Sequence, residues 1–126
     1  MSTRACYVFR DTYSTHVVYK HMDGYPDGAI EWIAKARALA WPFPRFEADE
    51  FAASFIAANK DRPGDVRTVG QGDWRELAPS DIEYVYIVHL GMVEAFAVSC
   101  DWGKSDWRVD RLFSHPLQDI ENAKAA

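Results

Sequence analysis

The sequence predicts an α+β fold, in which an antiparallel β-sheet of about five or six strands carries two main helices on one face and a short C-terminal helix. Short runs rich in β-branched and aromatic residues lie toward both ends of the chain, and a helical period replaces them in the middle. Glycines and prolines separate these runs. With 126 residues, 48% of them hydrophobic, we expect a single domain over residues 1–126.

Two strands are expected to open the chain as a hairpin. Residues 3–10 and 15–21 are rich in β-branched and aromatic side chains, and the polar residues 11–14 separate them. The second strand runs into residues 23–28 (DGYPDG), where two glycines and a proline favour a turn over regular structure.

Two amphipathic helices are expected next. The first begins at residue 29 and ends before the two prolines of residues 41–44 (WPFP), which disfavour helical geometry. The second covers residues 46–59, has acidic side chains near its N-terminus and presents Phe51 and Phe55 on its apolar face. The apolar positions of the first are Ile30, Ile33, Ala36 and Ala40.

The remaining strands are expected mainly in the C-terminal half. Residues 66–69 predict a short edge strand, and a loop rich in Gly and Asp follows it. Residues 81–90 are the strongest strand pattern, and Gly91-Met92 predicts a two-residue turn into an antiparallel partner over residues 93–100. After a loop, residues 107–113 predict the last strand, and Ser114 is the expected N-cap of the terminal helix.

Charge and composition narrow the function. The net charge of −5, with 14 basic residues interleaved among 19 acidic ones, argues against general nucleic-acid binding. No N-terminal apolar run or bilayer-length apolar stretch is present, so we expect no membrane partner and a cytoplasmic location. In that reducing setting Cys6 and Cys100 are expected to be free thiols.

The first candidate site is the polar cluster at the end of the second strand, which we list as Lys20, His21, Asp23, Tyr25 and Asp27. An imidazole beside carboxylates can bind a divalent metal, or the imidazole can act as a base near neutral pH. The same residues are also ordinary turn chemistry, because Asp-Gly and Pro-Asp-Gly are common in turns. We favour the structural interpretation and keep the cluster as a binding hypothesis.

The second candidate site is the charged loop before the last strand, with Trp102, Lys104, Trp107 and Arg108. Trp and Arg anchor many interfaces through large rigid area and planar donors. The alternative is that both indoles cap the end of the core. His89 lies among apolar strand residues and is expected to be a satisfied sheet residue.

Several strong signatures are absent from the sequence. There is no dinucleotide-binding glycine motif, no phosphate-binding loop, no zinc-protease pair of histidines and no nucleophile elbow. We therefore expect no cofactor, and the sequence favours a binding domain over an enzyme.

Three opening segments, STRA at residues 2–5, VYKH at 18–21 and DGYP at 23–26 followed by Gly28, resemble the start of a family of small uncharacterised phage and prophage proteins. A looser similarity lies in residues 45–51 and 112–113. The resemblance covers roughly the first quarter of the chain and implies a genomic setting in a bacterial host, with no reaction to assign.

These observations together predict a non-enzymatic binding domain. Its expected partner is a host protein or a small anionic ligand, and counter-defence is one of the roles that the analogy with other phage-borne domains allows. One alternative is a small metal-dependent hydrolase or nuclease that uses His21 with Asp23 or Asp27. Another is a structural, homo-oligomer-forming component of a particle.

Overall fold

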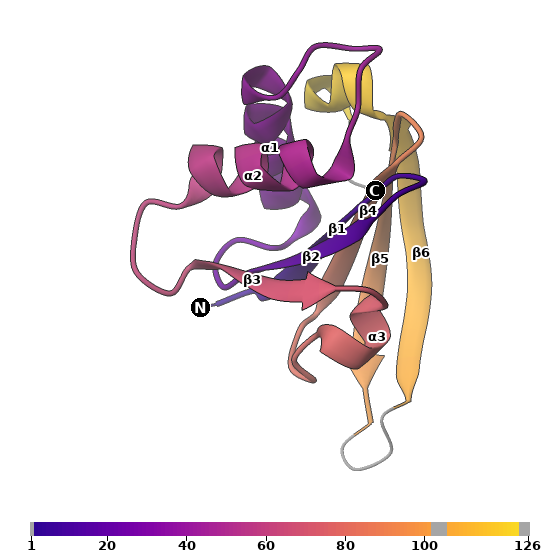
Figure 1. Ribbon diagram of the computed structural model, residues 1–126. Helices are drawn as coiled ribbons and strands as arrows, with labels where there is room; N and C mark the ends of the chain where they lie inside the picture. Colours follow the sequence, from indigo (N-terminus) through magenta and orange to yellow (C-terminus); the bar gives the residue numbers. More distant parts are fainter. Residues whose placement is uncertain (1, 102–105, 124–126) are drawn as a thin grey trace.

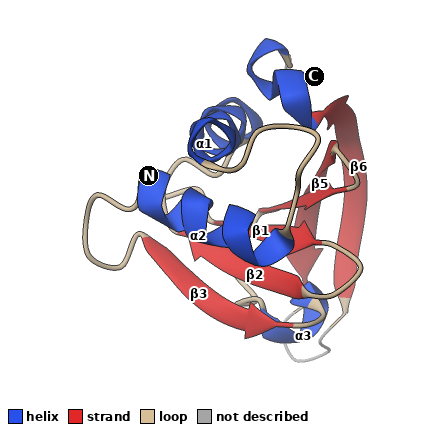
Figure 2. Cartoon of the chain, turned by 45° about the horizontal axis from the view of Figure 1, so that its top comes forward, coloured by secondary structure: helices blue, strands red, loops and turns tan. Residues whose placement is uncertain are grey.

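The computed structural model describes residues 2–101 and 106–123 and has an α+β fold, as the sequence predicts. Helices α1 (Pro26–Leu39) and α2 (Ala48–Asn59) cover one face of a six-stranded sheet, and the 3-10 helix η1 (Leu117–Asn122) lies beside α1 (Figures 1 and 2). The strand order is β3-β2-β1-β4-β5-β6. The strands are β1 (Ala5–Arg10), β2 (Thr15–Lys20), β3 (Val66–Gln71), β4 (Tyr84–His89), β5 (Met92–Cys100) and β6 (Trp107–Pro116).

The sheet is mixed, so the prediction of antiparallel pairing throughout is wrong for one pair of strands. Strand β1 pairs with β2 in the antiparallel sense and with β4 in the parallel sense, so that Tyr7 lies opposite both Val18 and Tyr86. A parallel pair needs a long crossover connection, and the chain between β2 and β4 supplies one that contains both main helices.

The main core lies between the sheet and the two helices. Alternate residues of β1 point to opposite faces, so Tyr7 and Phe9 meet the helices whereas Val8 points away from them. The ring of Phe55 on α2 lies 4.5 Å from that of Tyr7, and the ring of Phe51 lies 5.3 Å from that of Phe9. All four rings are almost fully buried, which confirms the predicted apolar face of the second helix.

Both main helices differ slightly from their predicted starts. Helix α1 begins at Pro26 rather than at residue 29, with the proline in its first turn, where a missing N–H costs no hydrogen bond. Helix α2 begins at Ala48 rather than at residue 46. None of the helices in the described ranges is long and apolar enough to cross a membrane.

A short helix on the second face was not predicted. Residues 70–80 were expected to form only a loop, but α3 (Trp74–Leu77) forms there, and Asp73 accepts a hydrogen bond from the backbone N–H of Arg75 at 2.9 Å. Trp74 is buried in a second apolar cluster with Cys6 and Val8. Burial raises the pKa of the Cys6 thiol to about 12, so this free cysteine is held as the unreactive thiol.

Several predicted boundaries in the C-terminal half are wrong by one or more residues, including the start of β4, which is Tyr84 rather than residue 81. The turn between β4 and β5 is centred on Leu90 and Gly91, not on Gly91 and Met92, and both central residues have positive φ, of 49° and 75°. This is the backbone that a two-residue hairpin turn of type I′ requires. Strand β6 continues through Ser114 to Pro116, so Ser114 does not cap the terminal helix.

The turn predicts that Leu90→Asn will stabilise the protein. A leucine with φ of 49° is strained, whereas Asn tolerates this conformation, and the leucine side chain is 82% exposed and has little burial to lose. We expect the free energy of unfolding in urea to rise by about 0.5–1 kcal/mol. Leu39→Asn, at an exposed helical position, should bring no gain, and an unchanged or lower value for Leu90→Asn would contradict the turn assignment.

Candidate functional site

The first predicted cluster contains a cation that faces inward. Lys20 is 2% exposed, and its Nζ lies 2.8 Å from Oδ2 of Asp65 and 3.1 Å from the carbonyl oxygen of Met22. The ring centroid of Trp32 lies 4.4 Å from the same nitrogen. Asp65 also accepts the backbone N–H groups of Met22 and His21. Lys20 therefore joins the end of β2 to the start of β3 from inside the fold.

His21 is half-buried, and both of its ring nitrogens are in hydrogen bonds. Its Nε2 lies 3.1 Å from Oγ of Ser2, and its Nδ1 lies 2.8 Å from the hydroxyl of Tyr19. Neither nitrogen is open to a metal ion or a substrate without breaking one of these contacts. Within the residues that the structure describes, no three His, Cys, Asp or Glu side chains gather closely enough to hold a metal ion.

The turn after β2 packs closely against the sheet. A Cβ on Gly24 would lie 2.7 Å from the Cβ of Ala5, and the carbonyl of Gly24 accepts a 2.6 Å hydrogen bond from the hydroxyl of Tyr86. A Cβ on Gly28 would lie 2.2 Å from the carbonyl oxygen of Asp23. These close approaches explain why glycine occupies both positions.

The three remaining residues of this cluster differ in exposure. Asp23 has a φ of 57°, and its carbonyl accepts a hydrogen bond from Nε1 of Trp32 at 3.0 Å. Tyr25 precedes α1 and is 43% exposed, and Asp27 lies exposed in the first turn of that helix. Tyr25 and Asp27 are thus the members of the cluster that present most surface to a partner.

The second predicted cluster is described only in part. Trp102 and Lys104 lie outside the described residues. Trp107, at the start of β6, donates its indole N–H to the carbonyl of Arg75 at 3.0 Å, and its ring meets that of Trp74 edge-on at 5.0 Å. Arg108 is exposed. No hydrogen bond or ion pair among the described residues joins this cluster to the first one.

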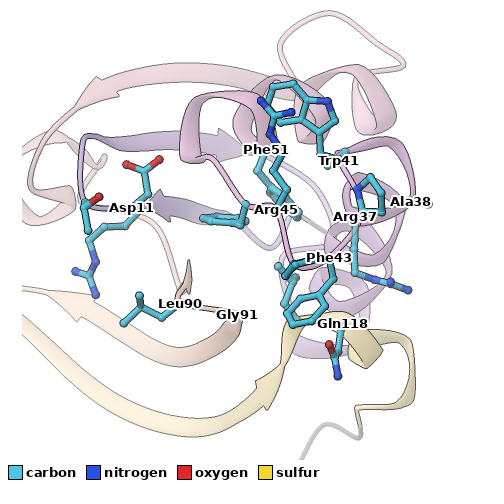
Figure 3. A pocket seen from close by; sticks show the side chains of 17 residues that line it. Asp11, Arg37, Ala38, Trp41, Phe43, Arg45, Phe51, Leu90, Gly91 and Gln118 are labelled. Carbon is cyan, nitrogen blue, oxygen red and sulfur yellow. The ribbon is translucent and has the colours of Figure 1, made fainter.

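A further hollow lies away from both predicted clusters. A cavity of about 730 Å³ is bounded by four segments that meet at one end of the sheet (Figure 3). These are the β1–β2 connection from Arg10, the end of α1 with the loop to α2, the Leu90–Gly91 turn, and the start of η1. We call it the loop cavity.

Large apolar side chains form its walls. Leu90 and Phe43 approach the hollow from opposite sides in Figure 3 and are 82% and 68% exposed. Trp41 is 40% exposed, and the buried Phe51 and Leu117 lie deeper. Exposed apolar groups that gather around one concavity are typical of a binding surface.

Three arginines line the same cavity. The guanidinium of Arg45 lies 3.3 Å above the ring of Trp41, and its Nε donates to Glu47 at 2.9 Å. Arg37 pairs with Glu121 at 2.6 Å in a partly exposed contact. The backbone N–H of Glu121 lowers the pKa of its carboxyl most, and Arg37 lowers it further. Arg10 makes no ion pair with any described residue.

The carboxylate that lines the cavity, Asp11, is already hydrogen-bonded to backbone N–H groups. Oδ1 of Asp11 accepts the N–H groups of Tyr13 and Ser14, and Oδ2 accepts the N–H of Ala48, the first residue of α2, at 2.8 Å. The bond from Ala48 is the largest of the causes that lower the pKa of this carboxyl. Because Glu47 makes no side-chain cap, Asp11 takes over the capping of α2.

Sequence reasoning missed this cavity because it treated residues 41–44 only as a helix terminator. The available signal was their composition, because two aromatic rings alternate with two prolines, which have no backbone N–H to continue a helix, and an arginine follows. Such a segment cannot fold its rings under a helix and leaves them near the surface.

Comparison of the chain with protein-family models, with curated proteins and with solved structures finds no match in any of the three.

The buried Lys20–Asp65 pair predicts a large loss of stability in Lys20→Met. Removal of the cation leaves the Asp65 carboxylate buried and uncompensated, which costs about 3–5 kcal/mol of unfolding free energy. Lys35→Met is the matched control, because Lys35 also lies over the Trp32 ring but pairs with Glu31 at the surface, where the expected loss is below about 1 kcal/mol. Urea denaturation compares the two. Equal losses would contradict the prediction, and Lys20→Met with Asp65→Asn should recover part of the stability.

The capping role of Asp11 predicts a pH-dependent loss in Asp11→Ala. We expect the variant to lose about 1–2 kcal/mol of unfolding free energy at neutral pH, because α2 loses its cap. The pKa of Asp11 is lowered on folding, so its charge stabilises the fold fully above the ordinary value of 3.8 and progressively less as the pH falls below it. The difference between wild type and variant should therefore narrow in acid. A constant difference would contradict the assignment, and Asp61→Ala is the exposed control.

Proposed function

We propose that the protein is a non-enzymatic binding domain and that the loop cavity holds a small anionic ligand with a flat apolar part. The observation that carries this proposal is the combination of aromatic walls and arginines in one hollow of about 730 Å³. That volume lies within the roughly 300–1,000 Å³ typical of small-molecule sites.

The walls fit a flat apolar group. Phe43 and Leu90 stand largely exposed on opposite sides of the hollow, and a ring inserted between them would remove apolar surface of both partners from water. Each Å² of apolar surface so buried contributes about 25 cal/mol. This gain supports a ligand with a ring system over a fully hydrophilic one.

The charges fit an anion. Three arginines line the cavity, of which Arg10 makes no ion pair with a described residue, and the carboxylate of Asp11 is already occupied by backbone N–H groups. Arg45 uses only its Nε toward Glu47, so its terminal nitrogens remain available as a planar pair of donors, and Trp41 holds the guanidinium in place. Planar donors of this kind bind a carboxylate, phosphate or sulfonate in a bidentate manner.

The other functional expectations stay predictions. The phage setting, the role in counter-defence and a host-protein partner have no observation among the described residues that favours them. The hydrolase and particle-component alternatives also stay untested. A protein partner that used the loop cavity would have to insert a ring and an acidic group. It would therefore make the same contacts that we propose for the small ligand.

The proposal predicts saturable binding of anilinonaphthalene sulfonate, an aromatic anion that becomes fluorescent in apolar sites. Arg45→Gln should weaken this binding about tenfold, because one charge-assisted pair of donors is lost. Phe43→Ala should weaken it by a similar factor through lost apolar contact. The neutral analogue phenylnaphthylamine, which has the same rings without the sulfonate, should bind more weakly and should not respond to Arg45→Gln.

The control for this experiment is Arg62→Gln, which changes an exposed arginine that pairs with Asp61 outside the cavity. It should bind the probe as the wild type does. Equal affinity for the charged and the neutral probe, or binding that ignores both Phe43→Ala and Arg45→Gln, would refute the proposed site.

A further inference from the structure

A second hollow lies on the face of the sheet that the two main helices leave uncovered. A groove of about 350 Å³ runs between α3 and the strands, with residues 72–75 as its wall. Figures 1 and 2 show α3 on the side of the sheet away from α1 and α2. The apolar floor is formed by Val8, Ile87, Phe96 and Val109, one from each of four adjacent strands.

The strand register explains why this floor is continuous. Val8 lies opposite Ile87 in the parallel β1–β4 pair, so the two side chains share a face. Phe96 and Val109 belong to the same apolar cluster as Val8, and they are only partly buried. Since α3 is four residues long, it covers only part of this cluster and leaves the rest accessible.

Two arginines flank the groove without a carboxylate partner. Neither Arg10 nor Arg75 makes an ion pair or a side-chain hydrogen bond with any described residue. The guanidinium of Arg75 lies 5.1 Å from the ring centroid of Trp74. The acid that lines the groove is Asp73, and one of its oxygens already accepts the backbone N–H of Arg75. The lining therefore carries an excess of positive charge.

The carboxylate of Glu94, on the same face of the sheet, already has partners. His89 is the neighbour of Arg10 across the β1–β4 pair, and its Nε2 hydrogen bonds to Oε1 of Glu94. The other oxygen of Glu94 lies 3.5 Å from Arg111. Glu94 thus pairs with His89 and Arg111 and does not neutralise the charge of Arg10.

From this arrangement we infer that the groove is a second binding site, separate from the loop cavity, for a small carboxylate with a compact apolar group. The carboxylate pairs with Arg75 and Arg10, and the apolar group lies on Ile87 and Phe96. The volume is near the lower end for ligand sites and limits the occupant to about one ring or a short branched chain.

Arg10 lines both hollows, so the two sites share one cation. It is the last residue of β1 and is exposed to solvent at the end of the strand. Arg75 lines only the groove, and Arg45 lines only the loop cavity. Substitutions at these three positions therefore separate the two sites from each other.

Sodium benzoate tests the inference, with the neutral and similarly shaped benzamide beside it. The indole N–H signals of Trp74 and Trp107 report on the groove by two-dimensional NMR, because both rings lie at α3, and the signal of Trp41 reports on the loop cavity. Benzoate should shift the Trp74 and Trp107 signals in a saturable way, and benzamide should bind about tenfold more weakly. Arg75→Gln and Arg10→Gln should each weaken the benzoate response by at least about fivefold.

Arg62→Gln is the matched control, since this exposed arginine pairs with Asp61 and does not line the groove, and it should leave the response unchanged. No saturable shift of either indole up to about 50 mM benzoate, equal binding of benzamide, or a normal response in Arg75→Gln would overturn the inference. The Trp41 signal keeps the two proposals apart. A response of Trp41 alone would refute the groove and leave the loop cavity standing, and a response of Trp74 and Trp107 alone would support the groove, while the loop cavity is judged by the naphthalene sulfonate probe.

Discussion

The packing of four aromatic rings between α2 and β1 is the constraint on which the rest of the structure depends. Phe51 and Phe55 lie on Tyr7 and Phe9 in a dry layer, and this contact fixes where α2 begins over the sheet. The chain that leaves α1 must then cross the end of the sheet to reach Ala48, and Asp11 receives it there through the backbone N–H. The loop that carries Trp41 and Phe43 therefore connects two fixed points, the end of α1 and the start of α2. The position of the loop cavity beneath it is a consequence of how the core packs.

Much of the fold could be predicted because hydrophobic period reports burial. The alternation in β1 and the helical spacing of the phenylalanines in α2 both reflect which side of an element faces the core. The direction of the β1–β4 pair could not be predicted in this way, because alternation is the same whether the partner strand is parallel or antiparallel. Helix α3 could not be predicted for a different reason. Four residues with one buried tryptophan are too short to show any period.

The candidate sites were harder to predict, because closeness in the sequence is a poor guide to partners in space. Lys20 stands beside His21 and Asp23 in the chain, but its charge is neutralised by Asp65, which is 45 residues away. The two glycines of the same segment are required because a Cβ would collide with Ala5 in one case and with Asp23 in the other. The loop cavity takes its walls from four separate segments, and no pattern within one of them defines it. Only the aromatic and proline-rich residues 41–44 carried a local sign that side chains would remain at the surface.

The end of β1 borders both hollows. Along a strand each side chain belongs to one face, and the sheet separates the helical side from the side of α3. Arg10 is the last residue of β1 and is paired with Thr15 and His89, and its exposed side chain has four rotatable bonds with which it can extend past the end of the strand. A single guanidinium thus borders the loop cavity and the groove together. An anion bound in one hollow would therefore lower the attraction of Arg10 for an anion in the other, and linkage requires this effect to be equal in both directions.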